Sequence, residues 1–286
     1  MNNSQTKIKL ALPKGRMQQG VFALLNDAGI QISASERSYR PTLSLANFEA
    51  KLLKPQSIIQ MLSANIRDLG FAGADWVVEQ GANLVELLDT ELDPVRLVVA
   101  APKGFSPTAT ESFTIASEYE QLAQTWVRKN GYDARFVRTF GATEVYPPED
   151  ADCIIDNVAT GNTLKYNGLV ILDEVMTSST RLYANTQCLE NPAKRDGIEQ
   201  LVLLLKSVLD ARARVMIEMN VENNYLDAII RAVPSMRTPT IAPLYNNSGF
   251  AVKSAVPRRS VGQLITELKR LGATDIVVSE LSQIVC

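Results

Sequence analysis

The stretch Asp156–Leu169, DNVATGNTLKYNGL, follows directly on the apolar run Cys153-Ile154-Ile155. The apolar run is typical of a buried strand, and the residues that follow Asn162 are typical of a short helix. Between the two the chain uses only small or polar residues, including Gly161, which permits positive φ and a close approach of a ligand. Backbone N–H groups at the start of a helix favour anions. The stretch therefore indicates a strand, a loop and a helix in sequence, in which residues 159–163 meet the requirements of an anion-binding loop.

Asp156 stands immediately before this loop. A carboxylate repels a bound phosphate, so we expect Asp156 to face ribose hydroxyls or a magnesium ion. An ordinary strand-to-helix turn in which Asp156 caps the helix is the alternative, and a single Gly/Thr turn taken alone favours that alternative. The loop is not a Walker loop, because the sequence has no GxxxxGK[ST].

Two further predicted strands end in residues suited to a ligand. LALPKGR, residues 10–16, places Lys14 and Arg16 beside a glycine at the carboxyl end of a strand, where a polyanion binds in many α/β sheets. A solvated basic turn is an equal alternative. LGFAGAD, residues 69–75, leaves its strand through glycines and reaches Asp75, a weak signal by itself.

Composition narrows the possible functions. The 286 residues are 46% hydrophobic and 21% charged, which is typical of globular proteins, with a net charge of -2. This charge gives no general basic field for nucleic acid or an anionic membrane. We find no apolar window of membrane-spanning length, no signal peptide and three widely spaced cysteines, so we expect a cytoplasmic protein. The sequence has no histidine, which excludes Ser-His pairs and HExxH zinc sites.

Strand and helix patterns alternate through the first two-thirds of the chain and predict an α/β fold with largely parallel sheets. The expected strands are 8–12, 45–52, 68–73, 97–101, 133–139, 152–155, 170–175 and 180–185, and the expected helices are 18–28, 55–64, 75–80, 117–130 and 197–212. From Arg214 the order changes to βαββαβ, the ferredoxin-like pattern. Its expected strands are 215–221, 239–245, 250–256 and 275–281, and its expected helices are 222–232 and 260–271.

Together these stretches resemble the ATP phosphoribosyltransferases of histidine biosynthesis, in their long form. LALPKGR resembles the opening motif of that family, DLGFAGAD its DLGITGxD segment, RLVVAAPKG its RLVVAVPKG strand, and DNVATGNTLKYNGL its DLVSTGNTLRANGL loop for phosphoribosyl pyrophosphate. The βαββαβ tail, which contains RTPTIAPL, is similar to the regulatory domain of the long form. The chain departs from the pattern at Phe71-Ala72, at Asn157, where the family usually has an apolar residue, and in the acidic turn 146–150.

The resemblance implies a two-lobed core like a periplasmic binding protein of type II, with the active site in the cleft, and a C-terminal ferredoxin-like regulatory domain. The first lobe would comprise residues 1–93 and 184–212, the second lobe 94–183, and the regulatory domain 213–286. The implied reaction is attack by N1 of ATP on C1 of the ribose, with loss of pyrophosphate, to give phosphoribosyl-ATP. Magnesium is the implied cofactor.

The resemblance also implies roles for single residues. The 5′-phosphate would be held by Ala159, Thr160, Gly161, Asn162 and Thr163. Asp156 would hold the ribose hydroxyls, with magnesium nearby and help from Glu144. Arg16 and Lys14 would contact the triphosphate or pyrophosphate, and Asp75 the nucleotide on the adenine side. Arg16 and Asp156 are the expected catalytic residues.

Other sites are weaker predictions. Asp173 and Glu174 are acidic enough to bind metal, although a solvated strand end is the favoured interpretation. The long form implies feedback inhibition by histidine, which we place at the predicted edge strand 239–243, with Thr240 and more weakly Thr238 as contacts. A dimerisation module without a ligand is the alternative. We expect a homo-oligomer, a dimer or a hexamer.

Two other functions stay open from the sequence. One is a two-lobed ligand-binding or regulatory protein that has lost the chemistry, and the other is a phosphoribosyltransferase with a different acceptor base.

Overall fold

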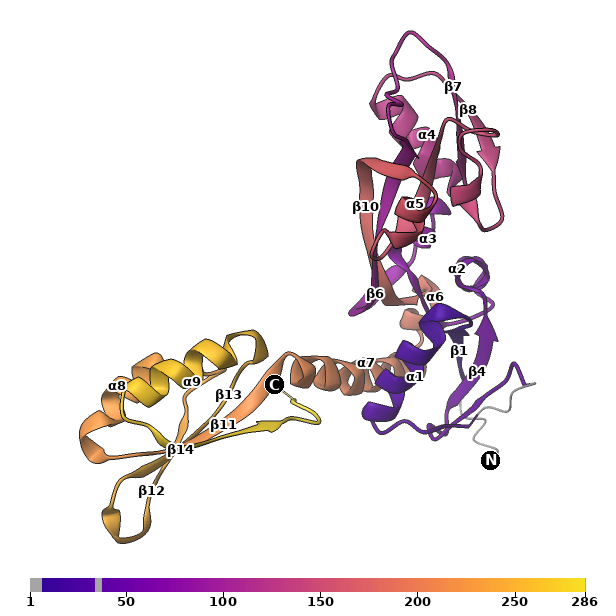
Figure 1. Ribbon diagram of the computed structural model, residues 1–286. Coiled ribbons are helices and arrows are strands. Elements are labelled where there is room, and N and C mark those ends of the chain that lie inside the picture. Colours follow the sequence, from indigo (N-terminus) through magenta and orange to yellow (C-terminus); the bar gives the residue numbers. More distant parts are fainter. Residues whose placement is uncertain (1–6, 34–37, 286) are drawn as a thin grey trace, which may run out of the picture. The chain divides into compact units, whose positions relative to one another are not determined.

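The computed structural model describes residues 7–33 and 38–285 (Figure 1). The predicted domains also include residues 1–6, 34–37 and 286, which lie outside the described residues. The chain divides into two compact units, the first being Met1–Ala23 with Ile30–Ile198 and the second Leu24–Gly29 with Glu199–Cys286. The predicted boundaries at 93, 183 and 212 stay predictions. No helix in the described ranges is long and apolar enough to cross a membrane.

The first unit is built on one eight-stranded sheet of order β4-β1-β5-β10-β6-β9-β7-β8. Its strands are β1 (Ile8–Pro13), β4 (Phe48–Leu53), β5 (Leu69–Gly73), β6 (Val85–Pro102), β7 (Phe113–Ser117), β8 (Ala134–Arg138), β9 (Cys153–Val158) and β10 (Leu169–Ala184). A separate two-stranded ribbon joins β2 (Ile32–Ser33) to β3 (Thr42–Leu43). The helices are α1 (Arg16–Asp27), which continues into the second unit, α2 (Pro55–Ser63), α3 (Ala74–Glu79), α4 (Glu120–Lys129), α5 (Asn162–Tyr166), α6 (Thr186–Glu190) and the start of α7 (Pro192–Arg212).

The sheet contains the same plan twice. The first lobe has the parallel strands β4-β1-β5, and the second lobe has the parallel strands β8-β7-β9, so that in each lobe the first strand lies between the second and the third. The antiparallel pair β6 and β10 lies between the two sets and belongs to both. The core of the chain is therefore the predicted two-lobed architecture, with the carboxyl ends of its parallel strands available for a site.

The extents of β6 and β10 differ from the prediction. The sequence indicated a strand only at 97–101 and two separate strands at 170–175 and 180–185, whereas each element is one long strand. Acidic residues and Pro94 interrupt the apolar pattern of β6, and its continuity comes from the ladder with β10, which contains several register irregularities. Because these strands pair antiparallel with β5, with each other and with β9, the sheet is also less parallel than expected.

The start of the second lobe was also predicted incorrectly. The expected helix 117–130 begins only at Glu120, and the strand β7 before it was missed. β7 is a short buried strand that pairs with β8 and β9, so its stability depends on partners far along the chain. The cores of both lobes consist of buried aliphatic and aromatic side chains on the sheet faces.

The second unit contains a ferredoxin-like domain, as predicted. Its elements are β11 (Arg214–Val221), α8 (Leu226–Ala232), β12 (Thr240–Pro243), β13 (Phe250–Pro257), α9 (Val261–Arg270) and β14 (Thr274–Glu280). The strands form an antiparallel sheet of order β12-β13-β11-β14, and α8 and α9 cover one face of it (Figure 1). Alternate residues of β11 are buried under these helices. β12 is an edge strand, in agreement with the prediction for residues 239–243.

Candidate active site

The end of β9 opens into a cavity of about 270 Å³. Its lining residues are Arg16, Glu144, Asp156, Asn157, Val158, Ala159, Thr160, Gly161, Thr163 and Leu164. The structure thus brings together the predicted phosphate loop, both predicted ribose-side acids and one of the two predicted cations. Asn162, the first residue of α5, does not line this cavity.

The loop itself is shaped for a ligand. Gly161 has φ +78°, in the left-handed region that glycine enters without strain. A Cβ at Gly161 would meet only Val158, at 3.6 Å, so the protein itself leaves this space open. Among the described residues, no hydrogen-bond acceptor faces the backbone N–H groups of Ala159, Thr160 and Gly161. These donors lie on an exposed loop and are free to bind an anion.

Asp156 lines this cavity, and its carboxyl is mostly buried. The pKa of its carboxyl is raised to about 6, mainly by burial and to a smaller extent by the negative charges of Glu144 and Glu118, whereas a hydrogen bond from the Asn157 backbone N–H (2.7 Å) opposes the rise. The carboxylate therefore carries its charge at neutral pH at a cost in folding free energy, which is typical of a functional group. Asp156 does not cap α5, because the N-cap residue is Gly161 and α5 has no side-chain cap.

The two predicted cations differ in their surroundings. Arg16 lines both the loop cavity and the neighbouring hollow at the centre of the cleft, and its side chain has no ion pair with a described carboxylate. Lys14 lines only the central hollow and donates a hydrogen bond to the Tyr39 hydroxyl (2.9 Å), which lowers the pKa of Tyr39. Arg16 is the cation that reaches both hollows.

The central hollow, about 230 Å³ in volume, contains a buried polar network around Asp75. Asp75 is only 5% exposed, and its two carboxylate oxygens accept hydrogen bonds from Tyr119 Oη (2.7 Å) and Ser178 Oγ (2.6 Å). Tyr119 Oη in turn accepts a hydrogen bond from Asn157 Nδ2 (3.2 Å), and its ring stacks on Trp76. The predicted nucleotide contact Asp75 therefore already binds two protein donors.

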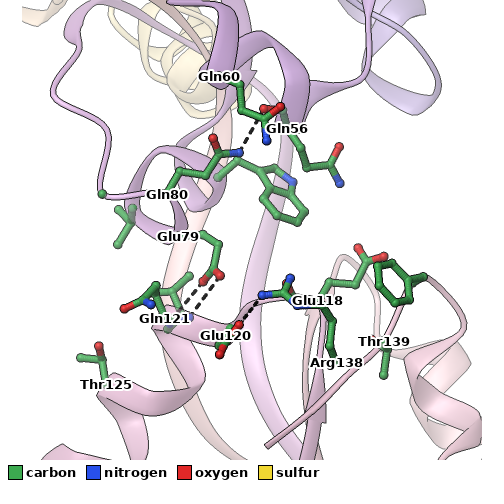
Figure 2. Close-up of a pocket in the computed structure, with 15 residues that line it drawn as sticks. Gln56, Gln60, Glu79, Gln80, Glu118, Glu120, Gln121, Thr125, Arg138 and Thr139 are labelled. Carbon is green, nitrogen blue, oxygen red and sulfur yellow. Dashed lines mark hydrogen bonds and ion pairs between the residues drawn. The ribbon is translucent and has the colours of Figure 1, made fainter. Parts of the chain in front are cut away.

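A third hollow of about 840 Å³ continues outward from the central one, with Gln56, Trp76 and Glu118 lining both (Figure 2). At its floor the Glu79 carboxylate of α3 accepts hydrogen bonds from the backbone N–H groups of Gln121 and Leu122 at the start of α4 (3.1 Å each), as the dashed lines show. This contact joins a helix of the first lobe to a helix of the second lobe. The cleft between the lobes thus runs from the phosphate loop to this open hollow.

The weaker metal candidates lie elsewhere. Asp173 accepts a hydrogen bond from Trp126 Nε1 (2.8 Å), and Glu174 forms an ion pair with Arg96 (3.3 Å). No cluster of three or more Cys, Asp or Glu side chains with metal-binding geometry occurs within the described ranges. These contacts agree with a structural role for both residues.

Several residues of the cleft were not singled out as site residues from the sequence, among them Trp76, Glu79, Glu118, Tyr119 and Ser178. Asn157 was noted only as a departure from the family pattern. Tyr119 and Ser178 lie 44 and 103 residues from their partner Asp75 in the sequence. The residues next to them in the sequence do not indicate a hydrogen bond to so distant a partner.

Fold and site together define a two-lobed α/β protein whose cleft contains a glycine loop with free backbone N–H groups beside a mostly buried carboxylate. A family model described as "ATP phosphoribosyltransferase" matches residues 54–207, and a second one, "HisG, C-terminal domain", matches residues 211–283. The ATP phosphoribosyltransferase of Pelotomaculum thermopropionicum is 35% identical over 287 residues, 98% of this chain and 99% of that protein. That of Chlorobaculum parvum is 35% identical over 294 residues and all of both chains.

Among solved structures, the ATP phosphoribosyl transferase (HisG:HisZ) complex from Thermotoga maritima contains a similar chain. Its TM-score is 0.62 and its sequence identity 26%, and the match covers 70% of this chain and 98% of that one. The chain belongs to the ATP phosphoribosyltransferase family. The family's reaction is the transfer of a phosphoribosyl group from phosphoribosyl pyrophosphate to ATP, the first step of histidine biosynthesis.

Proposed function

We propose that this cleft carries out the family's reaction with the 5′-phosphate of phosphoribosyl pyrophosphate in the loop cavity. The single observation that supports this placement best is the cavity itself, in which free backbone N–H groups, positive φ at Gly161 and the mostly buried Asp156 converge. Residues 159–163 hold the phosphate, with the hydroxyls of Thr160 and Thr163 as further donors. Asp156, with help from Glu144, accepts hydrogen bonds from the ribose hydroxyls.

The chemistry agrees with a site built from acids, cations and backbone amides. N1 of the adenine ring attacks C1 of the ribose with its own lone pair, and pyrophosphate leaves with the electron pair of the C1–O bond. No side chain has to remove a proton to create this nucleophile, so the lack of histidine in the sequence is no obstacle. The barrier arises from charge that develops on the ribose and the leaving group, and a preorganised donor at such a site typically contributes about 3 kcal/mol.

On the ATP side we assign Arg16 and Lys14 to the triphosphate or the leaving pyrophosphate. Arg16 is suited to either, because it lines both hollows and its guanidinium has no ion-pair partner in the described part of the chain. Asp75 is the proposed contact on the adenine side. Each of its oxygens has a second lone pair beyond the bonds to Tyr119 and Ser178. Arg16 and Asp156 are the proposed catalytic residues.

Magnesium fits the acids of the loop cavity. Asp156 and Glu144 line the same cavity, and the charge of Glu144 raises the pKa of Asp156, so a divalent cation would relieve their repulsion. Magnesium is commonly held by one or two carboxylates together with substrate phosphates, so a third acid is not required. When bound, the ion would supply charge neutralisation for the leaving pyrophosphate.

The direct test is incubation of the protein with ATP, phosphoribosyl pyrophosphate and magnesium while the absorbance of phosphoribosyl-ATP is followed. Product formation with ATP supports the proposal. Product only with another purine nucleotide would support a different acceptor base, and tight substrate binding without turnover would support a non-catalytic binding protein.

For the second unit we propose regulation by histidine, with Thr240 and more weakly Thr238 as contacts. Both side chains are exposed on or beside the edge strand β12, and Pro239 and Pro243 lie at its ends. Edge strands and the exposed side chains of Ile241 and Val277 on the same sheet support assembly of several copies, a dimer or a hexamer.

Calorimetry with the full chain tests this regulation. Heat of histidine binding at millimolar concentration, together with a change in sedimentation, supports it. No binding at that concentration would remove the regulatory proposal and leave the catalytic one unchanged. We also infer a cytoplasmic location, because Cys153 and Cys188 are free thiols in the structure, as expected in a reducing compartment.

A further inference from the structure

Asn157 lines both the loop cavity and the central hollow, and the proposed reaction assigns it no role. It stands in β9 between the proposed ribose acid Asp156 and the phosphate loop. Asn157 is half-buried, so its amide loses part of its contact with water and is stabilised by a hydrogen-bond partner in the protein. The structure supplies a partner from another element, because Asn157 Nδ2 donates a hydrogen bond to Tyr119 Oη (3.2 Å).

The hydrogen-bond directions in this network are fixed. Tyr119 donates its only proton to Asp75 Oδ2 (2.7 Å), so its oxygen can only accept from Asn157. Ser178 donates to Asp75 Oδ1 (2.6 Å) and accepts from the Asp75 backbone N–H (3.1 Å). Asp75 therefore accepts at both oxygens, and a residue at 157 that only accepts hydrogen bonds could not take the place of Asn157.

The surroundings hold these groups in place. Asp75, Tyr119 and Ser178 are each at most 5% exposed. Gly73 leaves room for the Asp75 carboxylate, since a Cβ there would overlap it. The Tyr119 ring stacks on Trp76, with 4.6 Å between the ring centroids.

The network also crosses the cleft. Asp75 lies on α3 of the first lobe, Tyr119 directly precedes α4 of the second lobe, and Asn157 lies at the base of the phosphate loop. Beside it Glu79, one helical turn after Asp75, binds the first N–H groups of α4 (Figure 2). α3 is thus attached to the second lobe at two points, and Asn157 connects the loop strand to one of them.

We propose that Asn157 is a positioning residue, which fixes the phosphate loop to the first lobe through Tyr119 and Asp75. This inference depends on the proposed binding of phosphoribosyl pyrophosphate at the loop. Without the Asn157 donor, β9 keeps its ladder but the loop loses its connection to the opposite lobe. The ground-state complex with phosphoribosyl pyrophosphate then weakens, while the chemical step in the fully bound complex changes little.

Asn157→Leu tests the proposal, because it removes the amide and keeps a similar volume. We expect the KM for phosphoribosyl pyrophosphate to rise about three- to tenfold, the range for one lost hydrogen bond, with kcat changed less than about twofold. Asn130→Leu is the matched control: it removes an amide that donates to the Trp126 carbonyl (2.9 Å) at the far end of α4, and it should leave this KM unchanged. Asn157→Ser repeats the comparison if leucine disturbs packing.

Tyr119→Phe distinguishes positioning from direct contact, since Asn157 also lines the loop cavity. The phenyl ring keeps the stacking on Trp76 and removes the hydroxyl. If Asn157 acts through Tyr119, the double variant should show the same KM as Tyr119→Phe alone. If the fold-increase in KM of the double variant is the product of the two single increases, Asn157 binds substrate directly and the proposal is overturned. An unchanged KM in both Asn157 variants would overturn it as well. If Gly161→Val also leaves this KM unchanged, the loop assignment itself fails.

Discussion

Replacing Asp156 by asparagine should stabilise the free protein at neutral pH while it weakens binding of phosphoribosyl pyrophosphate. The pKa of Asp156 is raised from 3.8 to about 6, mainly by burial, so the folded protein binds this proton more tightly than the unfolded chain. The contribution of Asp156 to the free energy of unfolding therefore falls as pH rises between about 4 and 6. Above pH 6 the cost of its ionisation is almost fully present. At 1.36 kcal/mol for each pKa unit, the cost reaches about 3 kcal/mol at pH 7.5 and about 1 kcal/mol at pH 4.5.

Asparagine carries no charge, and its Oδ1 can still accept the hydrogen bond from the Asn157 backbone N–H. The free energy of unfolding of the variant should therefore be higher than that of the wild type by up to about 3 kcal/mol at pH 7.5 and by about 1 kcal/mol at pH 4.5. Urea unfolding followed by tryptophan fluorescence measures this in the first unit, because both tryptophans, Trp76 and Trp126, lie there. Asp133→Asn, an exposed acid with no side-chain partner in the described part of the chain, is the control and should show no such difference. A variant less stable than the wild type at pH 7.5 would refute the reasoning and make Asp156 a structural residue.

Three further predictions concern other parts of the chain. Gly161→Val should raise the KM for phosphoribosyl pyrophosphate, whereas Gly168→Val, with a similar φ of +71° outside the loop, should lower only the melting temperature. Glu79→Gln should lower the free energy of unfolding in urea by about 1 kcal/mol, because a charged acceptor at the start of α4 becomes neutral. Its control, Glu111→Gln at an exposed position, should leave this free energy unchanged. Thr240→Val should weaken histidine binding in calorimetry while Thr266→Val on α9 does not; equal affinities would place the effector elsewhere.

The parts of the site that were predictable from the sequence are those made by consecutive residues. The loop 159–163 and the cation Arg16 each follow a strand within a few residues, so local composition shows both the element and its exit. The ferredoxin-like order was equally visible, because each of its strands and helices has its own apolar pattern.

The network around Asp75 was not predictable in this way. Its hydrogen bonds join residues 38, 44 and 103 positions apart. The sequence around a tyrosine or serine does not predict a hydrogen-bond partner at such a distance along the chain. The length of β6 could not be predicted from the sequence for a related reason. Its first half contains Asp89, Glu91 and Asp93, and only pairing with β10 makes these residues part of a strand.

The long pair β6 and β10 has a consequence for the order of folding. Leu169 lies opposite Pro102 in their ladder, so the chain leaves at Pro102, builds β7, β8 and β9, and returns to the same point. This ladder can form only after the ends of a long loop meet, and the entropy of loop closure rises with loop length. Collapse of the inserted segment shortens that loop, so we expect the second lobe to acquire structure before the first lobe completes its sheet. Because the two ends of the segment are neighbours, the second lobe has the arrangement of an inserted domain, which can fold as a unit within the chain that surrounds it.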